Sequence, residues 1–295
     1  MYNFDQPKKE EIKKIQDYAN NLRLELGFTK ESPIANEIFT ILDKLEIALL
    51  EYPIKPDGDK PAFSAVLIHL TNAWKELSFI GLNTADYYDK QIFAVAHELY
   101  HYITKTGSHL SRLTEEQNDL TEINANRFAA EFLLPEDKLE SIIVDEFETY
   151  DLSKVKQKTL LRFIARLHCI WWLPYRSIVR RLKEIEAIST TQFDNLYNHI
   201  NERDFNGEYG SIGTAINKEV FTKLNTLTQS KGTSPNNIEI ILRNFEDNII
   251  DEDQLSNLLN LFDKKPENFG YEINVSKDDL IEFETFFNEG ENDDN

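Results

Sequence analysis

Apolar residues recur every three to four positions at the start of the chain, which is the spacing of an amphipathic helix. The pattern predicts helices over residues 8–26 and 33–45. It then changes to three short apolar runs, at residues 47–54, 62–70 and 77–83, and their β-branched and aromatic content predicts strands.

Helical spacing returns after the third run and dominates the rest of the chain. It predicts a helix over residues 90–105, and Gly107 is expected to end it because glycine readily adopts the left-handed terminating conformation. A further helix is predicted over residues 121–134. Residues 160–188 indicate two helices that meet at a Leu-Pro turn, which is a helix-turn-helix-like outline.

Composition narrows the class of protein. No stretch approaches the ~18 uninterrupted apolar residues of a membrane span, so no membrane association is expected. The charged, helical start shows no apolar signal-peptide core, and the single cysteine, Cys169, excludes an internal disulfide framework. These features predict a cytoplasmic protein. They also mean that a metal site must be built from histidines and carboxylates.

Charge is large and unevenly distributed. The formal net charge of −20 at pH 7 disfavours sequence-independent binding to DNA, because phosphates repel such a surface. However, residues 152–183 contain no acidic residue, whereas residues 246–295 are strongly acidic. One interpretation is that the two regions complement each other within the fold. The other is a local nucleic-acid or partner patch, for which the candidates are Arg176, Arg180, Arg181 and Lys183.

The clearest chemical motif lies in the helix predicted over residues 90–105. His97-Glu98-Leu99-Tyr100-His101 is a complete H-E-x-x-H. Residues four apart on a helix project from one face, so both imidazoles can bind one metal ion while Glu98 reaches its water. Another face carries an apolar stripe that would anchor the helix in the core. The competing interpretation is a pair of surface histidines whose hydrogen bonds are made by water or by the backbone.

A catalytic zinc generally takes three protein ligands and one water, so a third ligand decides between these interpretations. Position 107, where a metzincin-type histidine would stand, is glycine, and His109 misses that register. The remaining candidates are the downstream acids Glu115, Glu116, Asp119 and Glu122. Glu122 is favoured because it lies on a predicted helix, which holds a ligand more rigidly than a loop does.

Asn126 follows Glu122 by one helical turn and lies on the same face. A hydrogen bond from this side chain to a ligand histidine would fix the histidine's tautomer. Solvation on the helix surface is the alternative, and the sequence does not separate the two.

At these two motifs the sequence resembles the ImmA/IrrE family of bacterial metallopeptidases. Residues 93–103, FAVAHELYHYI, are similar to the family's F-t-l-A-H-E-l-g-H. Residues 122–135, EINANRFAAEFLLP, are similar to its E-x-x-A-N-x-F-A-A-x-L-L-x-P. The resemblance covers roughly residues 33–140, and a weaker likeness continues through residues 183–188, where family members often carry a helix-turn-helix-like segment.

The resemblance implies a zincin-like fold with a gluzincin-like site for one Zn²⁺ per chain. Carried over to this sequence, His97, His101 and Glu122 match the metal ligands, and Glu98 matches the general base. It also implies a helix-turn-helix repressor as the substrate, whose cleavage derepresses mobile-element, stress-response or phage-defence genes. Two features depart from the family. Tyr100 stands where glycine is usual, and the N-terminal helix-turn-helix domain of many members is missing, so a recognition module is expected after residue 135.

We therefore predict an α+β protein in three parts. Residues 1–145 form a zincin-like metallopeptidase domain, with a small antiparallel or mixed sheet and the active-site helices. Residues 146–200 form a helical, helix-turn-helix-like segment, and residues 201–295 a helical acidic domain with a disordered tail. The strand at 79–83 is expected to offer an edge for an extended substrate. For the oxyanion donor the candidates Tyr100, Tyr102, Arg127 and His109 stay open.

The leading hypothesis is a zinc-dependent endopeptidase, and two alternatives belong to other classes. One is a non-proteolytic anti-repressor or binding module with structural or vestigial zinc. Glu98 counts against it, because structural zinc needs no base and is usually closed by four protein ligands. The other is a nucleic-acid-sensing regulator activated by DNA, in which Trp171, Trp172 and Tyr175 stack on bases. Such rings more often form the core of a helix-turn-helix outline.

Overall fold

The computed structural model describes residues 9–55, 63–71, 76–106 and 120–271. The chain divides into two compact units, and the boundary lies between Ser234 and Pro235. Both predicted domain limits, at residues 145 and 200, lie inside the first unit, and the predicted three-part division stays a prediction.

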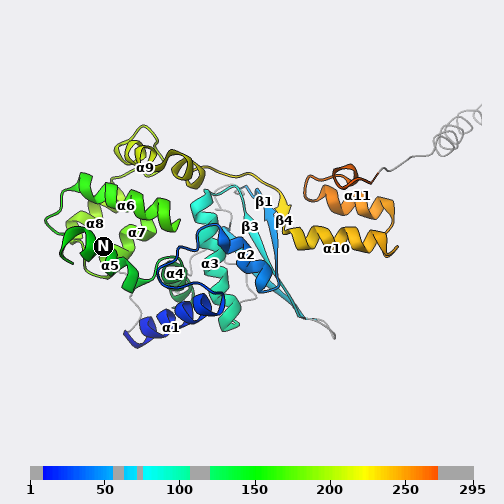
Figure 1. The fold of residues 1–295 in the computed structure, drawn as a ribbon, viewed down its shortest axis with the longest axis horizontal. Helices are drawn as coiled ribbons and strands as arrows, with labels where there is room; N and C mark the ends of the chain where they lie inside the picture. Colours follow the sequence, from blue (N-terminus) through cyan, green and yellow to red (C-terminus); the bar gives the residue numbers. More distant parts are fainter. Residues whose placement is uncertain (1–8, 56–62, 72–75, 107–119, 272–295) are drawn as a thin grey trace, which may run out of the picture. The chain divides into compact units, whose positions relative to one another are not determined.

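The first unit contains a four-stranded mixed sheet with strand order β2-β3-β1-β4 (Figure 1). β3 pairs parallel to β1 and antiparallel to β2, and β4 pairs antiparallel to β1. The strands are β1 (Ile47–Tyr52), β2 (Ala65–Thr71), β3 (Glu76–Asn83) and β4 (Gly232–Thr233). The sequence predicted the first three, whereas the two-residue β4 has no apolar run to mark it.

The prediction that residues 79–83 form a substrate-binding edge is wrong. β3 lies between β1 and β2, so its backbone groups are paired on both sides. β2 is instead an outermost strand among the described residues. An apolar pattern shows which face of a strand is buried, and it carries no information about which neighbour the strand pairs with.

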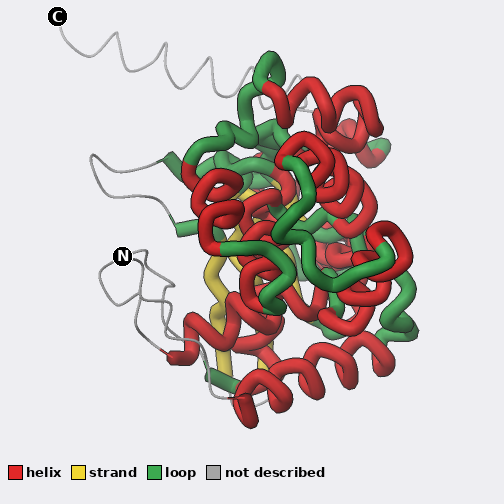
Figure 2. Tube along the Cα trace, turned by 90° about the vertical axis from the view of Figure 1, so that its left-hand side faces the viewer, coloured by secondary structure: helices red, strands yellow, loops and turns green. Residues whose placement is uncertain are grey.

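Helices complete the first unit, and Figure 2 shows them packed against the small group of strands. The first four are α1 (Lys9–Glu25), α2 (Glu37–Lys44), α3 (Tyr88–Thr104) and α4 (Leu120–Leu133). The next five are α5 (Glu136–Phe147), α6 (Gln157–Trp171), α7 (Tyr175–Glu184), α8 (Thr190–Asn198) and α9 (Glu208–Leu224). This mixture of a small sheet and many helices confirms the predicted α+β class.

α3 is the helix that carries the H-E-x-x-H motif, and it contacts β2, β3 and α4. Its predicted apolar stripe is buried, since Ile92, Val95 and Leu99 are each 0% exposed. Opposite them the sheet contributes Leu67, Ile80 and Leu82, which are also buried. Burial of an apolar side chain of this size stabilises a fold by about 1.5–3 kcal/mol, so this packing holds α3 firmly against the sheet.

α3 ends earlier than the sequence predicted. Its last residue is Thr104, and Lys105 takes the left-handed conformation with φ of 52°. The backbone N–H of Lys105 bonds the carbonyl of His101. Gly107, the predicted end, lies outside the described residues. Glycine is the most common residue in this conformation, but a lysine adopts it here where the chain leaves the helix.

The predicted helix-turn-helix-like outline corresponds to α6 and α7, which pack together and are joined by residues 172–174. The described part of the second unit, residues 235–271, contains two packed helices, α10 (Pro235–Glu246) and α11 (Glu252–Asn260), followed by the 3-10 turn η1 (Pro266–Phe269). The predicted disordered tail lies outside the described residues. Among the described residues, no helix is long and apolar enough to cross a membrane.

Candidate metal centre

α3 and α4 bring three side chains together at one point. The Nε2 atoms of His97 and His101 lie 3.2 Å apart. The carboxylate of Glu122 places Oε2 3.1 Å from the first of these atoms and Oε1 3.3 Å from the second. Among the described residues, this is the group of histidines, cysteines and acids whose ligand atoms converge closely enough to hold a metal ion.

The outer nitrogen of each imidazole is occupied, which directs its Nε2 atom inwards. Nδ1 of His97 lies 3.1 Å from Oδ1 of Asn126. Nδ1 of His101 lies 2.6 Å from the carbonyl oxygen of Thr106. Both partners are acceptors, so each Nδ1 carries the proton and each Nε2 keeps a free lone pair. Asn126 therefore contacts His97, one of the candidate ligands, as one of its two predicted roles requires.

The donor set fits a zinc ion. Zinc bonds imidazole nitrogen and carboxylate oxygen at about 2.0–2.1 Å, so neighbouring donors of a tetrahedral site lie about 3.3 Å apart. The two imidazole nitrogens lie 3.2 Å apart, and each lies 3.1 or 3.3 Å from a different oxygen of the Glu122 carboxylate. One atom from each of the three residues can be chosen so that all lie within 4.8 Å of one another. Two neutral imidazoles and one carboxylate also form the ligand class of known catalytic zinc sites, which leave a fourth position open.

Glu98 lies next to this group but does not belong to it. Its Oε2 accepts a hydrogen bond from the backbone N–H of Leu67 in β2, at 3.0 Å. The side chain is 2% exposed. Burial raises its pKa, and the neighbouring histidines oppose that shift. A carboxylate with a raised pKa is a better proton acceptor than an exposed one, which suits a general base.

The groups around the site also shift one another's pKa. The close approach of His101 and His97 holds the pKa of Glu122 well below its usual range. Burial lowers the pKa of His101, but its contacts with Glu122 and Glu98 outweigh burial and raise it overall. Glu122 is therefore ionised at neutral pH and available as a ligand.

Four residues were open candidates for the oxyanion donor, and three of them are engaged elsewhere. The hydroxyl of Tyr100 hydrogen-bonds Asn124, and that of Tyr102 donates to the carbonyl of Leu45. Arg127 pairs with two acids of the neighbouring helices, Glu136 and Glu184. His109 lies outside the described residues, as do the rejected ligand candidates Glu115, Glu116 and Asp119.

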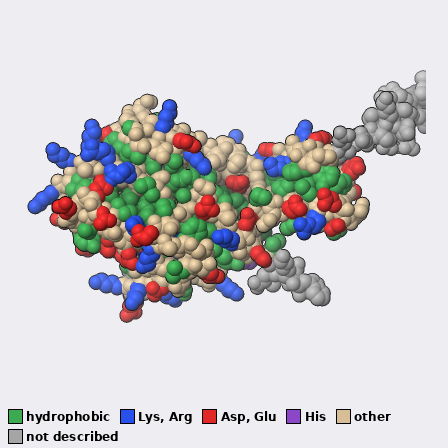
Figure 3. Space-filling model, viewed as in Figure 1, with side chains coloured by type: hydrophobic (Ala, Val, Ile, Leu, Met, Phe, Trp, Pro, Cys, Tyr) green, Lys and Arg blue, Asp and Glu red, His purple; other side chains and the backbone are tan. Residues whose placement is uncertain are grey.

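The prediction that Arg181 belongs to a surface patch is wrong. Arg181 is 1% exposed and bonds Glu131, which is itself 2% exposed, at 2.6 Å. Arg176 and Arg180 are more exposed, but they bond Glu202 and Tyr197. The acidic partners of these arginines, Glu131 and Glu202, lie in the first unit and outside residues 246–295. The predicted complementation between the basic region and that acidic region therefore stays a prediction. Figure 3 shows acidic and basic side chains interspersed on one face of the first unit.

The aromatic residues on which the nucleic-acid interpretation depends are buried. Trp171, Trp172 and Tyr175 are 2%, 8% and 0% exposed, so their rings are not available to stack on bases. They belong to the core where α6 and α7 meet. Lys183, the last member of the predicted patch, bonds the hydroxyl of Thr190.

Two groups in the site escaped prediction because they belong to the backbone. The N–H of Leu67 orients Glu98, and the carbonyl of Thr106 orients His101. Neither role depends on a side chain, so the residue type carries no signal for it.

The region that contains the site is similar to a known peptidase family. Residues 62–165 match the peptidase family model described as the IrrE N-terminal-like domain. The match includes both motifs and confirms the resemblance there, whereas residues 33–61 and the weaker likeness at residues 183–188 lie outside it. No curated protein and no solved structure matches the chain.

Proposed function

We propose, on the premise that residues 62–165 form an ImmA/IrrE-family, IrrE N-terminal-like peptidase domain, that this protein is a zinc-dependent endopeptidase. Its substrate is a helix-turn-helix transcriptional repressor, and cleavage derepresses mobile-element, stress or phage-defence genes. The observation that carries the catalytic part is the convergence of His97, His101 and Glu122 beside a buried Glu98. The substrate rests on the family resemblance of the two motifs.

Each side chain has a distinct task in this proposal. Zinc held by His97, His101 and Glu122 would supply Lewis acidity, which polarises a peptide carbonyl and lowers the pKa of water. Glu98 takes a proton from the attacking water and returns it to the leaving amine. Asn126 and the carbonyl of Thr106 hold the two imidazoles in the tautomer that faces the metal.

Among the described residues, no strand pairs with the outer edge of β2, and this edge is suited to bind an extended substrate. The N–H of Leu67 donates to Glu98, so this edge of the strand adjoins the base. A peptide that pairs along residues 65–71 would therefore run past Glu98 with its backbone held by hydrogen bonds. β2 replaces β3 in this role, because β3 has no open edge.

The decisive experiment first looks for a helix-turn-helix repressor encoded next to this protein. It then co-expresses the two and analyses the products by mass spectrometry. The wild type is expected to produce repressor fragments, whereas Glu98→Gln is expected to keep its zinc and leave the repressor intact. Glu148→Gln is the matched control, because Glu148 is exposed and ends α5.

Two outcomes would contradict the proposal. Normal cleavage by Glu98→Gln would remove Glu98 as the base. A stable complex of wild-type protein with intact repressor, at full zinc occupancy, would favour a non-proteolytic anti-repressor.

A further inference from the structure

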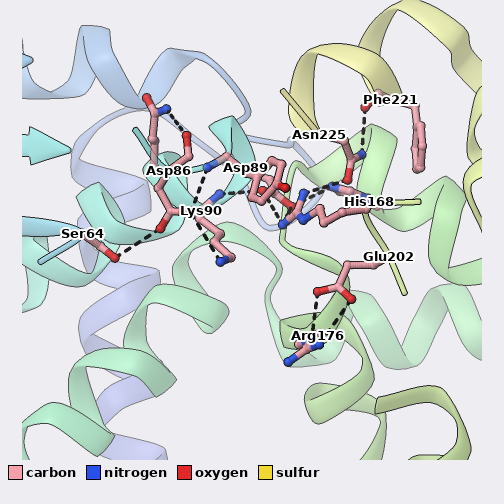
Figure 4. A network of polar contacts seen from close by, with 12 residues as sticks. Ser64, Asp86, Asp89, Lys90, His168, Arg176, Glu202, Phe221 and Asn225 are labelled. Atoms are coloured by element: carbon pink, nitrogen blue, oxygen red, sulfur yellow. Dashed lines mark hydrogen bonds and ion pairs between the residues drawn. The ribbon is translucent and has the colours of Figure 1, made fainter. Parts of the chain in front are cut away.

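A network of buried polar side chains surrounds the first turn of α3, at the end opposite the metal ligands. Its centre is Asp89, which is 0% exposed. Asp89 lies eight residues before His97, which corresponds to about 12 Å along a helix. Figure 4 shows Asp89 and His168 pointing towards each other, with Asn225 and Phe221 beyond.

The partners of Asp89 come from distant parts of the chain. Arg203 bonds both carboxylate oxygens through Nη2, at 2.9 and 3.0 Å. Nε2 of the fully buried His168 lies 3.2 Å from Oδ2. Burial alone would raise the pKa of Asp89, but His168 and Arg203 outweigh burial and hold that pKa below its ordinary value. Asp89 is therefore a buried anion with two partners, an arrangement that is costly to break.

Arg203 is itself held in place. Nη1 donates to Oδ1 of Asn225 at 2.7 Å, and the guanidinium lies 4.1 Å from the centre of the Tyr87 ring. The amide of Asn225 in turn donates to the carbonyl of Phe221 at 2.8 Å. Arg203 thus contacts both the start of α3 and the end of α9, and it links the position of one helix to that of the other.

Residues 225–234, which follow α9 and are called here the strap, make further hydrogen bonds to the start of α3 and to the residues just before it. The carbonyl of Thr226 accepts the backbone N–H of Tyr88, at 3.1 Å. Gln91 donates to the hydroxyl of Thr228 at 3.0 Å, and Thr84 donates to the carbonyl of Ser230 at 2.6 Å. The strap then forms β4 against β1.

These contacts replace the usual local cap of a helix. The N-cap residue of α3, Tyr87, offers no side-chain acceptor. Two orphan N–H groups of the first turn find acceptors elsewhere: that of Tyr88 bonds the strap, and that of Lys90 bonds Asp89 at 2.8 Å. A carboxylate at this position also interacts favourably with the helix dipole. Residues 168, 203 and 225–230, which support the first turn of α3, all lie beyond the matched region 62–165.

We infer that Asp89 and Arg203 are positioning residues for the metal centre, which hold α3 in the setting where His97 and His101 meet Glu122. The residues from Arg203 to Ser234 are then part of the working peptidase. The kinetic part of this inference, the effect on kcat and KM, rests on the proposed function. Its effect on zinc affinity can be measured without assuming that function. The three ligand atoms converge from two helices, so a small rotation or shift of α3 against α4 separates them.

The test measures zinc affinity of the full-length protein by competition with a chromogenic chelator, together with kcat and KM. Asp89→Asn is expected to weaken zinc binding by about tenfold or more and to lower kcat, while KM changes by less than about threefold. Arg203→Lys keeps the positive charge but loses the two-bonded geometry, so it is expected to fall between Asp89→Asn and the wild type. It also serves as the readable variant if Asp89→Asn does not fold.

The control separates positioning from loss of stability. Leu196→Ala removes a side chain of α8 that is 1% exposed, and it is expected to lower the melting temperature without changing zinc affinity. Unchanged zinc affinity and kcat in folded Asp89→Asn and Arg203→Lys would overturn the inference, and so would an equal loss in Leu196→Ala. If the wild type binds zinc but cleaves nothing, the proposed function fails, whereas weakened zinc binding in Asp89→Asn would still support the positioning role.

Discussion

Replacing Asn126 with alanine tests whether the metal centre depends on the support of its ligands. Oδ1 of Asn126 lies 3.1 Å from Nδ1 of His97 and accepts its proton. Without this acceptor, the imidazole is free to rotate and to place its proton on Nε2, the atom that faces the other ligands. Each zinc-binding event in the variant must then restore the tautomer and the orientation of the ring.

The structure sets the expected size of the effect. Loss of a group that orients a ligand typically weakens metal binding by 10–100-fold, or about 1.4–2.7 kcal/mol. Asn126 is only half-buried, so water is able to take over part of its role. His101 also keeps its own acceptor, the carbonyl of Thr106. Both facts favour the lower end, a loss of about tenfold.

The assay is competition for zinc with a chromogenic chelator at neutral pH. Asn126→Asp retains an acceptor at the same place, so it is expected to bind zinc at least as tightly as the wild type. Asn124→Ala is the matched control, because Asn124 lies on the same helix but its amide donates to Glu11 of α1. Affinity of Asn126→Ala within about twofold of the wild type would refute the reasoning, as would equal losses in Asn126→Ala and Asn126→Asp.

Three further predictions concern stability and reactivity. The pKa of Asp89 is lower in the folded protein than in the unfolded chain, so its ionised form contributes stability above about pH 4, and that contribution is lost as the pH falls further. The difference in urea midpoint between wild type and Asp89→Asn should therefore shrink from pH 6 to about pH 3, and a constant difference would contradict it. Arg181→Met leaves the buried Glu131 carboxylate without its partner and should lower the free energy of unfolding by about 3–5 kcal/mol, measured with urea. The double variant Arg181→Met/Glu131→Leu should recover part of this loss. A loss below about 1 kcal/mol in the single variant would show that the pair is not needed for stability. Burial raises the pKa of Cys169 to about 11, so the native thiol should react slowly with a thiol reagent at pH 8 and fully in denaturant, and rapid native labelling would disprove its burial.

The sequence alone determined the local part of the candidate metal centre. His97 and His101 share a face because four residues on a helix make slightly more than one turn, and this holds wherever the helix is placed. The apolar stripe through Ile92, Val95 and Leu99 predicted which side of α3 is buried for the same reason. The choice of Glu122 depended on its place in a second helix, and the structure brings it to the histidines.

Tertiary structure alone decided the features that depend on distant pairings. Sequence charge made Arg181 a surface candidate, but its burial follows from meeting Glu131 on another helix. The pairing of β3 on both sides depends on β1 and β2 together. The support of Asp89 depends on His168 and Arg203, which lie 79 and 114 positions further along the chain. Local spacing specifies the direction of a side chain relative to its own helix or strand. The partner that meets it is selected by the packing of the whole unit, to which no short stretch of sequence corresponds.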